Sequence, residues 1–228
     1  MKYTVILMDA DDTIFDFSKC EYNAVKNTFV KNGFDFSQDL YETFSKINDG
    51  LWKKFEKGEI ERSELRVERF RMTCGYFGFY NDMQRVNKLA DDYVEELSQQ
   101  TILIDGAYEA IEKISHYCDI YIITNGLRVV QRGRFGKTQI TKFFKDIFIS
   151  DEIGVQKPQK EFFDYVLKRV SEKDKKKILV LGDSLTSDMQ GGKNAGLDTC
   201  LYDPKSKITV PNELCDYKII SLDEVLKI

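Results

Sequence analysis

The chain alternates short apolar runs with segments of helical periodicity, and the short runs predict β-strands. Each run is nearly all apolar and most are rich in β-branched residues, which is typical of strands covered on both faces in a parallel sheet. The expected strands are 3–8, 120–124, 147–150, 177–182 and 199–202, with a weaker sixth at 217–220.

Helix-length segments lie between most of these strands. Residues 106–117 and 158–170 place apolar residues at helical spacing, and Pro158 suits a first helical position. Residues 187–196 predict a helix that ends near Gly196. Strands that alternate with helices indicate an α/β protein with a doubly wound, Rossmann-like parallel sheet.

One long segment breaks this alternation. Residues 18–100 contain no convincing strand and instead show several amphipathic helical patterns. The first of these begins at Ser18 and stops at Gly33, as helices commonly do. We therefore expect a Rossmannoid core formed by residues 1–17 and 101–228, with an all-helical domain inserted at 18–100.

Polar residues follow four of the expected strands. In an open α/β sheet, ligands bind at the carboxyl ends of the strands, so these residues are expected to share one site. The four segments are "DADDT" at 9–13, "TNG" at 124–126, "DEIGVQKP" at 151–158 and "GDSLTSD" at 182–188.

The acids in these segments have the chemistry of a metal-assisted nucleophile. Asp9 and Asp183 would present hard oxygen ligands from two strands, which suits Mg²⁺. A carboxylate in "DADDT" can act as a nucleophile and form an aspartyl-phosphate. A second carboxyl two residues later can protonate the leaving alcohol and later accept a proton from water.

The other segments have the chemistry of a phosphate site. Thr124 and Asn125 can donate hydrogen bonds to phosphate oxygens, and Gly126 allows close backbone approach. Lys157 adds a positive charge, which together with Mg²⁺ would offset the repulsion between a carboxylate and an incoming phosphate. Any one of these segments alone is also compatible with an ordinary turn or a surface lysine.

The ordered set of motifs resembles the haloacid dehalogenase (HAD) superfamily. DxDxT, a Thr/Asn turn, a lone Lys and GDxxxxD follow one another between Asp9 and Asp188. The resemblance implies that Asp9 is the nucleophile and Asp11 the general acid and base, while Thr124 and Lys157 hold the phosphoryl group. It also implies Mg²⁺ ligands at Asp9, Asp183 and the main-chain carbonyl of Asp11, with Asp188 supporting the metal site or Lys157.

Within this superfamily, the segment 18–100 corresponds to a helical cap that closes over the substrate. The carboxyl group at Asp11 disfavours a true dehalogenase, which lacks it. "DADDT", with "LWKKFEKGEI" at 51–60 and "ELRVERF" at 64–70, is similar to the YjjG-type pyrimidine 5′-nucleotidase branch. That similarity implies nucleoside 5′-monophosphate substrates, pyrimidine ones favoured, and makes Trp52 a candidate to stack on the base.

Two other functions use the same parts. A phosphatase or phosphomutase of sugar phosphates or other small phosphometabolites would keep the aspartyl-phosphate. A signalling module similar to a response-regulator receiver would also combine an aspartate with nearby acids, Thr and Lys. The length of the chain, the helical insertion and the nucleophile after the first strand disfavour the signalling module.

The composition limits the kinds of binding partner and the cellular compartment that we expect. The net charge is −4, from 34 basic and 38 acidic residues, so a broad basic surface for a nucleic acid polymer is not expected. Five scattered cysteines without a CxxC pair favour a reducing compartment. No apolar run approaches the ~20 residues of a membrane span. We expect a cytoplasmic monomer or homodimer that binds a small phosphorylated metabolite and no membrane.

Overall fold

The computed structural model describes residues 2–79, 82–206 and 213–228. The chain forms two compact units, which are described separately. The sheet unit comprises Met1–Phe17 and Thr101–Ile228, and the helical unit comprises Ser18–Gln100.

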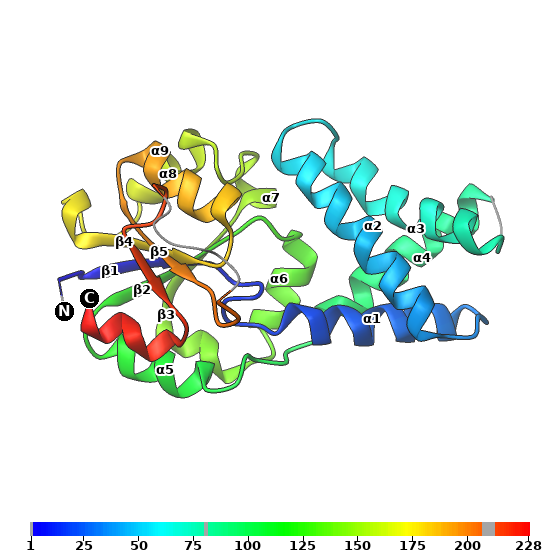
Figure 1. Cartoon of the computed structure of the whole chain (residues 1–228), viewed down its shortest axis with the longest axis horizontal. Coiled ribbons are helices and arrows are strands. Elements are labelled where there is room, and N and C mark those ends of the chain that lie inside the picture. Colours follow the sequence, from blue (N-terminus) through cyan, green and yellow to red (C-terminus); the bar gives the residue numbers. More distant parts are fainter. Residues whose placement is uncertain (1, 80–81, 207–212) are drawn as a thin grey trace. The chain divides into compact units, whose positions relative to one another are not determined.

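The sheet unit is built on six parallel strands in the order β3-β2-β1-β4-β5-β6 (Figure 1). The predicted α/β sheet is therefore confirmed, and every expected strand is present within a few residues of its expected bounds. The strands are β1 (Val5–Met8), β2 (Asp119–Thr124), β3 (Phe144–Ile149), β4 (Ile178–Gly182), β5 (Asp198–Tyr202) and β6 (Tyr217–Ile219).

Side chains of each strand alternate between two apolar cores, one on each face of the sheet. Ile6 and Met8 of β1 pack in one core with the helix α5 (Ala107–Ser115), whereas Val5 and Leu7 pack in the other with the helix α8 (Lys160–Leu167). All four side chains are buried. This two-sided burial explains why the strand sequences are almost continuously apolar.

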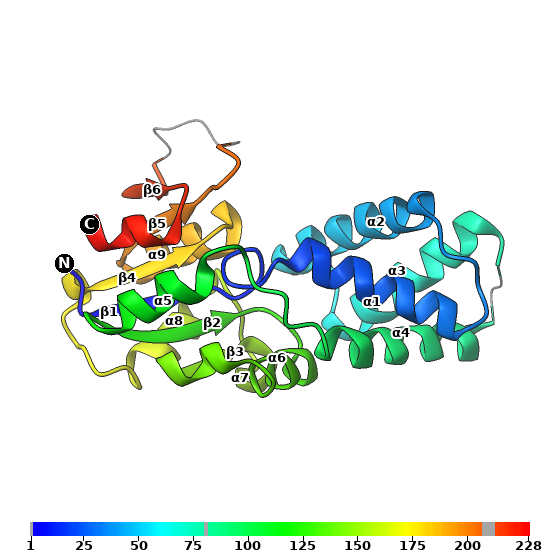
Figure 2. The ribbon, with the colours of Figure 1, turned by 90° about the horizontal axis from the view of Figure 1, so that it is seen from below.

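Helices connect the strands and cover both faces of the sheet (Figure 2). They are α5 (Ala107–Ser115), α6 (Arg128–Phe135), α7 (Ser150–Ile153), α8 (Lys160–Leu167) and α9 (Gln190–Ala195). Short 3₁₀ turns lie at Gln139–Phe143, Lys175–Lys177 and Leu222–Lys227, and a π-helical turn lies at Leu185–Met189.

Two details of these helices differ from the sequence expectation. Pro158 does not start a helix: the Gln159 amide donates to the Gln156 carbonyl at 2.8 Å, which closes a turn around Pro158, and α8 begins at Lys160. The helix α6 was not predicted at all, because Arg128–Phe135 contains few apolar residues.

The helical unit consists of α1 (Phe17–Lys31), α2 (Gln38–Glu56), α3 (Arg62–Phe77) and α4 (Met83–Ser98). Ser37 caps α2 by accepting from the Leu40 amide, and Gly78 ends α3 in the left-handed conformation. In the interior of the helical unit, the aromatic rings of Phe44, Phe70 and Tyr93 contact one another at centroid distances of 5.0–5.5 Å. Among the described helices of either unit, none combines the length and apolarity that a membrane crossing requires.

A buried polar network crosses the interior of the helical unit. Asn48 donates to Glu21 Oε1 at 2.7 Å, and Arg69 donates to Asn48 Oδ1 at 3.0 Å. The Arg69 guanidinium also lies 4.4 Å from the centroid of the Tyr93 ring. Burial raises the pKa of Glu21 to about 7, although hydrogen bonds from Ser45 and Asn48 and the charge of Arg69 act against this rise.

Candidate active site

The sheet places Asp9 at the point where the strand order reverses. β1 lies between β2 and β4, and Met8 is in register with Ile122 on one side and Leu181 on the other. The Asp9 amide continues this pairing by donating to the Leu181 carbonyl at 2.8 Å. Ligands of doubly wound sheets bind at this switch point, so Asp9 lies where the fold favours a site.

Lys157 joins two carboxylates at this edge of the sheet. Its Nζ lies 2.5 Å from Asp9 Oδ1 and 2.7 Å from Asp188 Oδ1, and it donates to the Ile123 carbonyl at 2.9 Å. Lys157, Asp9 and Asp188 are all buried. The three partners account for the three donors of an ammonium group, so the Lys157 side chain is fixed in place.

Around Lys157, negatively charged groups outnumber positively charged ones, and this shifts several pKa values. Burial acts to lower the pKa of Lys157, but the carboxylates of Asp188 and Asp9 outweigh it and hold that pKa above its ordinary value. Burial raises the pKa of Asp9 to about 8, helped by Asp188 and Asp11 and opposed by Lys157. Burial and the neighbouring Asp9 and Asp188 raise the pKa of Asp183 well above its ordinary value. One ammonium thus faces several crowded carboxylates.

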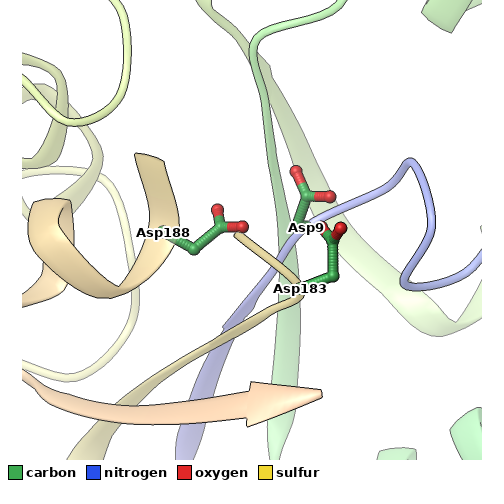
Figure 3. Close-up of side chains that lie close together, drawn as sticks. All are labelled: Asp9, Asp183 and Asp188. Carbon is green, nitrogen blue, oxygen red and sulfur yellow. The ribbon is translucent and has the colours of Figure 1, made fainter. Parts of the chain in front are cut away.

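Asp9, Asp183 and Asp188 form an acidic cluster suited to a metal ion (Figure 3). One carboxylate oxygen from each residue lies within 4.8 Å of the others. Asp183 follows β4, and Asp188 lies in the π-helical turn. Asp9 and Asp188 are buried and Asp183 is half-buried, and such a set of oxygen donors with an excess of negative charge fits a hard divalent cation such as Mg²⁺.

The side chain of Asn125 contacts the main chain of Lys157. Its Nδ2 donates to the Lys157 carbonyl and its Oδ1 accepts from the Lys157 amide, both at 2.9 Å. Asn125 therefore holds the loop that carries Lys157. The neighbouring Thr124 is buried, and its Oγ1 accepts from the Gly126 amide at 3.0 Å. Phosphate binding by Thr124, Asn125 and Gly126 stays a prediction.

The carboxylate of Asp11 does not join the acidic cluster but meets the helix α6. Gln131 Nε2 donates to Asp11 Oδ2 at 2.7 Å, and Arg134 forms a short ion pair with Asp11 Oδ1. Sequence reasoning missed both residues. The signal was present: Gln131 and Arg134 are three positions apart and so share one face of a helix.

The structure also shows the local contacts of Asp12 and Trp52. Asp12 has a φ of 56°, in the left-handed region that glycine adopts most readily. Its side chain accepts from the Phe17 amide at 3.2 Å, at the start of α1. Trp52 packs edge-on against Phe55 within the helical unit, at a centroid distance of 5.5 Å, so its role in substrate binding stays a prediction.

Residues 6–202 match the sequence model of the family described as haloacid dehalogenase-like hydrolase. The chain belongs to this family. The match spans every residue of the acidic cluster together with Lys157, Gln131 and Arg134. This HAD-like hydrolase is therefore an enzyme, and the matched residues include the cluster at the carboxyl edge of the sheet.

Three curated relatives are similar over most of their length. YfnB of Bacillus subtilis, named as a HAD-hydrolase, is 37% identical and covers 100% of this chain and 95% of its own. The pyrimidine 5′-nucleotidase PynA of Streptococcus pneumoniae is 32% identical, covering 99% of this chain and 94% of its own. The pyrimidine 5′-nucleotidase YjjG of Escherichia coli is 30% identical, covering 88% and 86%.

Solved structures agree with these relationships. A crystal structure of YfnB bound to magnesium has a TM-score of 0.92 and covers 100% of this chain and 98% of its own, with 37% identity. The L-2-haloacid dehalogenase of Xanthobacter autotrophicus has a TM-score of 0.72 at 16% identity, covering 99% of this chain and 97% of its own. At this low identity, the similarity to the dehalogenase shows only that the two proteins share a fold.

Proposed function

We propose that this HAD-like hydrolase is a Mg²⁺-dependent phosphatase that cleaves small phosphomonoesters through an aspartyl-phosphate on Asp9. The observation that carries the proposal is the contact of Asp9 with Lys157 beside Asp183 and Asp188. This contact supports the proposal because a carboxylate able to act as a nucleophile, a fixed cation and carboxylates able to bind a metal ion would then share one switch point of the sheet.

In the first step, an Asp9 oxygen attacks phosphorus and the bond from phosphorus to the ester oxygen breaks. Asp11 gives its proton to the departing alkoxide, which leaves as an alcohol. Lys157 contacts Asp9 directly, so its charge lies next to the forming acyl-phosphate. A fixed charge in a buried site stabilises a developing anion more strongly than it would in water.

In the second step, water attacks the phosphorus atom of phospho-Asp9. Asp11, now a carboxylate, takes a proton from that water, and the bond from phosphorus to the Asp9 oxygen breaks. Inorganic phosphate leaves and Asp9 regains its carboxylate. The proton taken up by Asp11 restores the acid for the next turnover.

Asp9, Asp183 and Asp188 are the side chains that would hold Mg²⁺, with the main-chain carbonyl of Asp11 as a further ligand and Asp188 shared with Lys157. When bound, the ion supplies positive charge that offsets the repulsion between these carboxylates and a phosphate group. The excess of buried negative charge supports this assignment, as does the magnesium in the structure of YfnB.

The favoured substrates are nucleoside 5′-monophosphates, with pyrimidines first. Support comes from PynA and YjjG, both named pyrimidine 5′-nucleotidases, at 32% and 30% identity. In this proposal residues 18–100 act as the cap that encloses the substrate, and Trp52 contacts the base. Closure of such a segment excludes water from the reacting groups.

The proposal is tested by measuring phosphate release with Mg²⁺ from UMP, dTMP, purine monophosphates, sugar phosphates and 4-nitrophenyl phosphate. Pyrimidine monophosphates should give the highest kcat/KM, and Asp9→Asn should abolish turnover. Preference for a sugar phosphate would overturn the substrate assignment and leave the mechanism standing. Equal activity of Asp9→Asn would overturn the mechanism. Unchanged UMP kinetics in Trp52→Ala would remove Trp52 from the substrate site.

A further inference from the structure

The helix α6 holds both oxygens of the Asp11 carboxylate. Gln131 Nε2 donates to Oδ2 at 2.7 Å, and the Arg134 guanidinium pairs with Oδ1. Gln131 and Arg134 are fully buried, whereas the Asp11 side chain is 28% exposed. Two donors on different oxygens fix the plane of a carboxylate, which one donor cannot do.

The surroundings of Gln131 are shaped for this contact. A Cβ atom on Gly126 would lie 2.3 Å from Gln131 Nε2 and 2.9 Å from its Cγ, so only glycine leaves room for the side chain in its present path. Gln131 Oε1 makes no hydrogen bond within the part of the chain that the structure describes. A buried amide oxygen without a hydrogen-bond partner destabilises the folded state. Gln131 keeps its contact with Asp11 despite this destabilisation.

An aromatic ring also contacts the guanidinium of Arg134. Its guanidinium carbon lies 3.9 Å from the centroid of the Phe15 ring, and Phe15 itself is fully buried. Burial of a guanidinium is costly unless it is paired, and Asp11 supplies a paired charge. Phe15 lies in the turn that also contains Asp11, so the contact with the ring and the ion pair both fix Arg134 relative to the carboxylate.

We propose that Gln131 and Arg134 are positioning residues for the proton transfers of Asp11. This inference rests on the proposed function, in which Asp11 protonates the leaving alcohol and then deprotonates water. Neither residue is required to touch the substrate. Each donates to a separate oxygen, so the carboxyl group keeps its orientation when it gains or loses the proton between the two steps.

Leaving-group dependence distinguishes positioning of the acid from a general structural role. A nucleoside 5′-alkoxide leaves poorly and requires the proton of Asp11, whereas 4-nitrophenolate leaves readily without it. The ratio kcat/KM covers the steps up to release of this leaving group, and hydrolysis of phospho-Asp9 comes afterwards. A displaced Asp11 should therefore lower kcat/KM for UMP much more than for 4-nitrophenyl phosphate.

The test compares Gln131→Met, which removes the donor to Asp11 Oδ2, with Arg134→Lys, which removes the guanidinium that pairs with Oδ1. Each should lower kcat/KM for UMP by about 10- to 100-fold and leave 4-nitrophenyl phosphate within about threefold of wild type. The double variant should lose less than the product of the two single losses, because both residues act on the same carboxyl group. Arg132→Met on the same helix, which removes the ion pair with Glu152, is the control and should change neither substrate.

The outcomes separate this inference from the proposed function. Equal losses on UMP and 4-nitrophenyl phosphate, or no loss on either, would overturn the positioning role while the wild-type phosphatase stands. Absence of turnover by the wild-type enzyme on every phosphate of the panel would overturn the proposed function and this inference together. If Gln131→Met does not fold, judged by its circular dichroism and thermal transition, Arg134→Lys decides the same question.

Discussion

Gly182 leaves the space that the carboxyl group of Asp188 occupies. A Cβ atom at Gly182 would lie 2.3 Å from Asp188 Oδ2 and 2.4 Å from its Cγ. Asp188 Oδ2 also accepts from the Ser184 amide at 3.2 Å, while Oδ1 accepts from Lys157. The last residue of β4 thus decides where a member of the acidic cluster can lie.

Gly182→Ala should therefore displace Asp188 and weaken binding of Mg²⁺. Loss of a residue that orients metal ligands commonly lowers metal affinity by about 10- to 100-fold, so the Mg²⁺ concentration for half-maximal activity should rise by that factor. Gly50→Ala in α2, where a Cβ would meet nothing within 4 Å, is the matched control. An unchanged Mg²⁺ requirement in folded Gly182→Ala would contradict the role given to this contact.

Lys157→Met should impair both activity and stability. It removes the ammonium that contacts Asp9 and Asp188, and leaving buried charges without their partner commonly costs about 3–5 kcal/mol. We expect kcat to fall by about 100- to 1,000-fold and the chain to unfold at lower urea concentration. Lys160→Met, which breaks only an exposed pair with Asp164, should change stability by less than about 1 kcal/mol. Similar urea midpoints for the two variants would contradict a stabilising role for the ion pairs of Lys157 with Asp9 and Asp188.

Asp183→Asn should separate stability from function. The carboxylate of Asp183 is crowded by Asp9 and Asp188, so its neutral replacement should raise the melting temperature in EDTA by a few degrees. Mg²⁺ at about 100 times its Kd should stabilise the wild type by about 2.7 kcal/mol and the variant far less. Phosphatase activity should be lost in the variant. Thermal unfolding with and without Mg²⁺ measures both effects, and equal stabilisation of the two proteins by Mg²⁺ would remove Asp183 from the metal site.

Glu21 should make the stability of the helical unit depend on pH. Burial raises its pKa in the folded chain to about 7 from an ordinary value of 4.5. Between these values the folded state keeps a proton that the unfolded state has released, so stability falls as pH rises from 4.5 to about 7 and then levels off. The charged and polar groups that face Glu21 are Tyr41, Ser45, Asn48, Asp49 and Arg69.

Glu21→Gln should remove this dependence. Relative to wild type, the variant should gain up to roughly 3 kcal/mol in free energy of unfolding between about pH 5 and about pH 8. Urea unfolding at both pH values measures the difference, and Glu42→Gln, a change at an exposed position of α2, is the control. Parallel pH profiles for wild type and Glu21→Gln would show that Glu21 ionises normally in the folded chain.

The sheet and the acids at its edge could be predicted because their signals are local. Asp9 and Asp183 each follow a run of apolar residues directly, and a parallel sheet brings the carboxyl ends of its strands together. The partner of Asn125 could not be predicted in this way. An amide after a strand can bind phosphate or a main chain with equal ease, and Lys157 is distant in the sequence and near only in the fold.

The helix α6 shows a second limit. Its buried face includes the polar residues Gln131 and Arg134, so a search for apolar periodicity passes over it. Their burial is favourable only because Asp11 and Phe15, more than 100 positions earlier, supply a carboxylate and a ring. Polar residues at helical spacing become informative once a distant partner of opposite charge is known.

The most direct test of the central claim is to trap the covalent intermediate on Asp9. Wild-type enzyme is mixed with UMP and Mg²⁺, quenched in acid within the first turnover, digested and analysed by mass spectrometry. We predict a phosphate adduct on the peptide that contains Asp9, labile to hydroxylamine and missing in Asp9→Asn. Efficient turnover of UMP with no adduct at Asp9, or with an adduct at another residue, would contradict the mechanism.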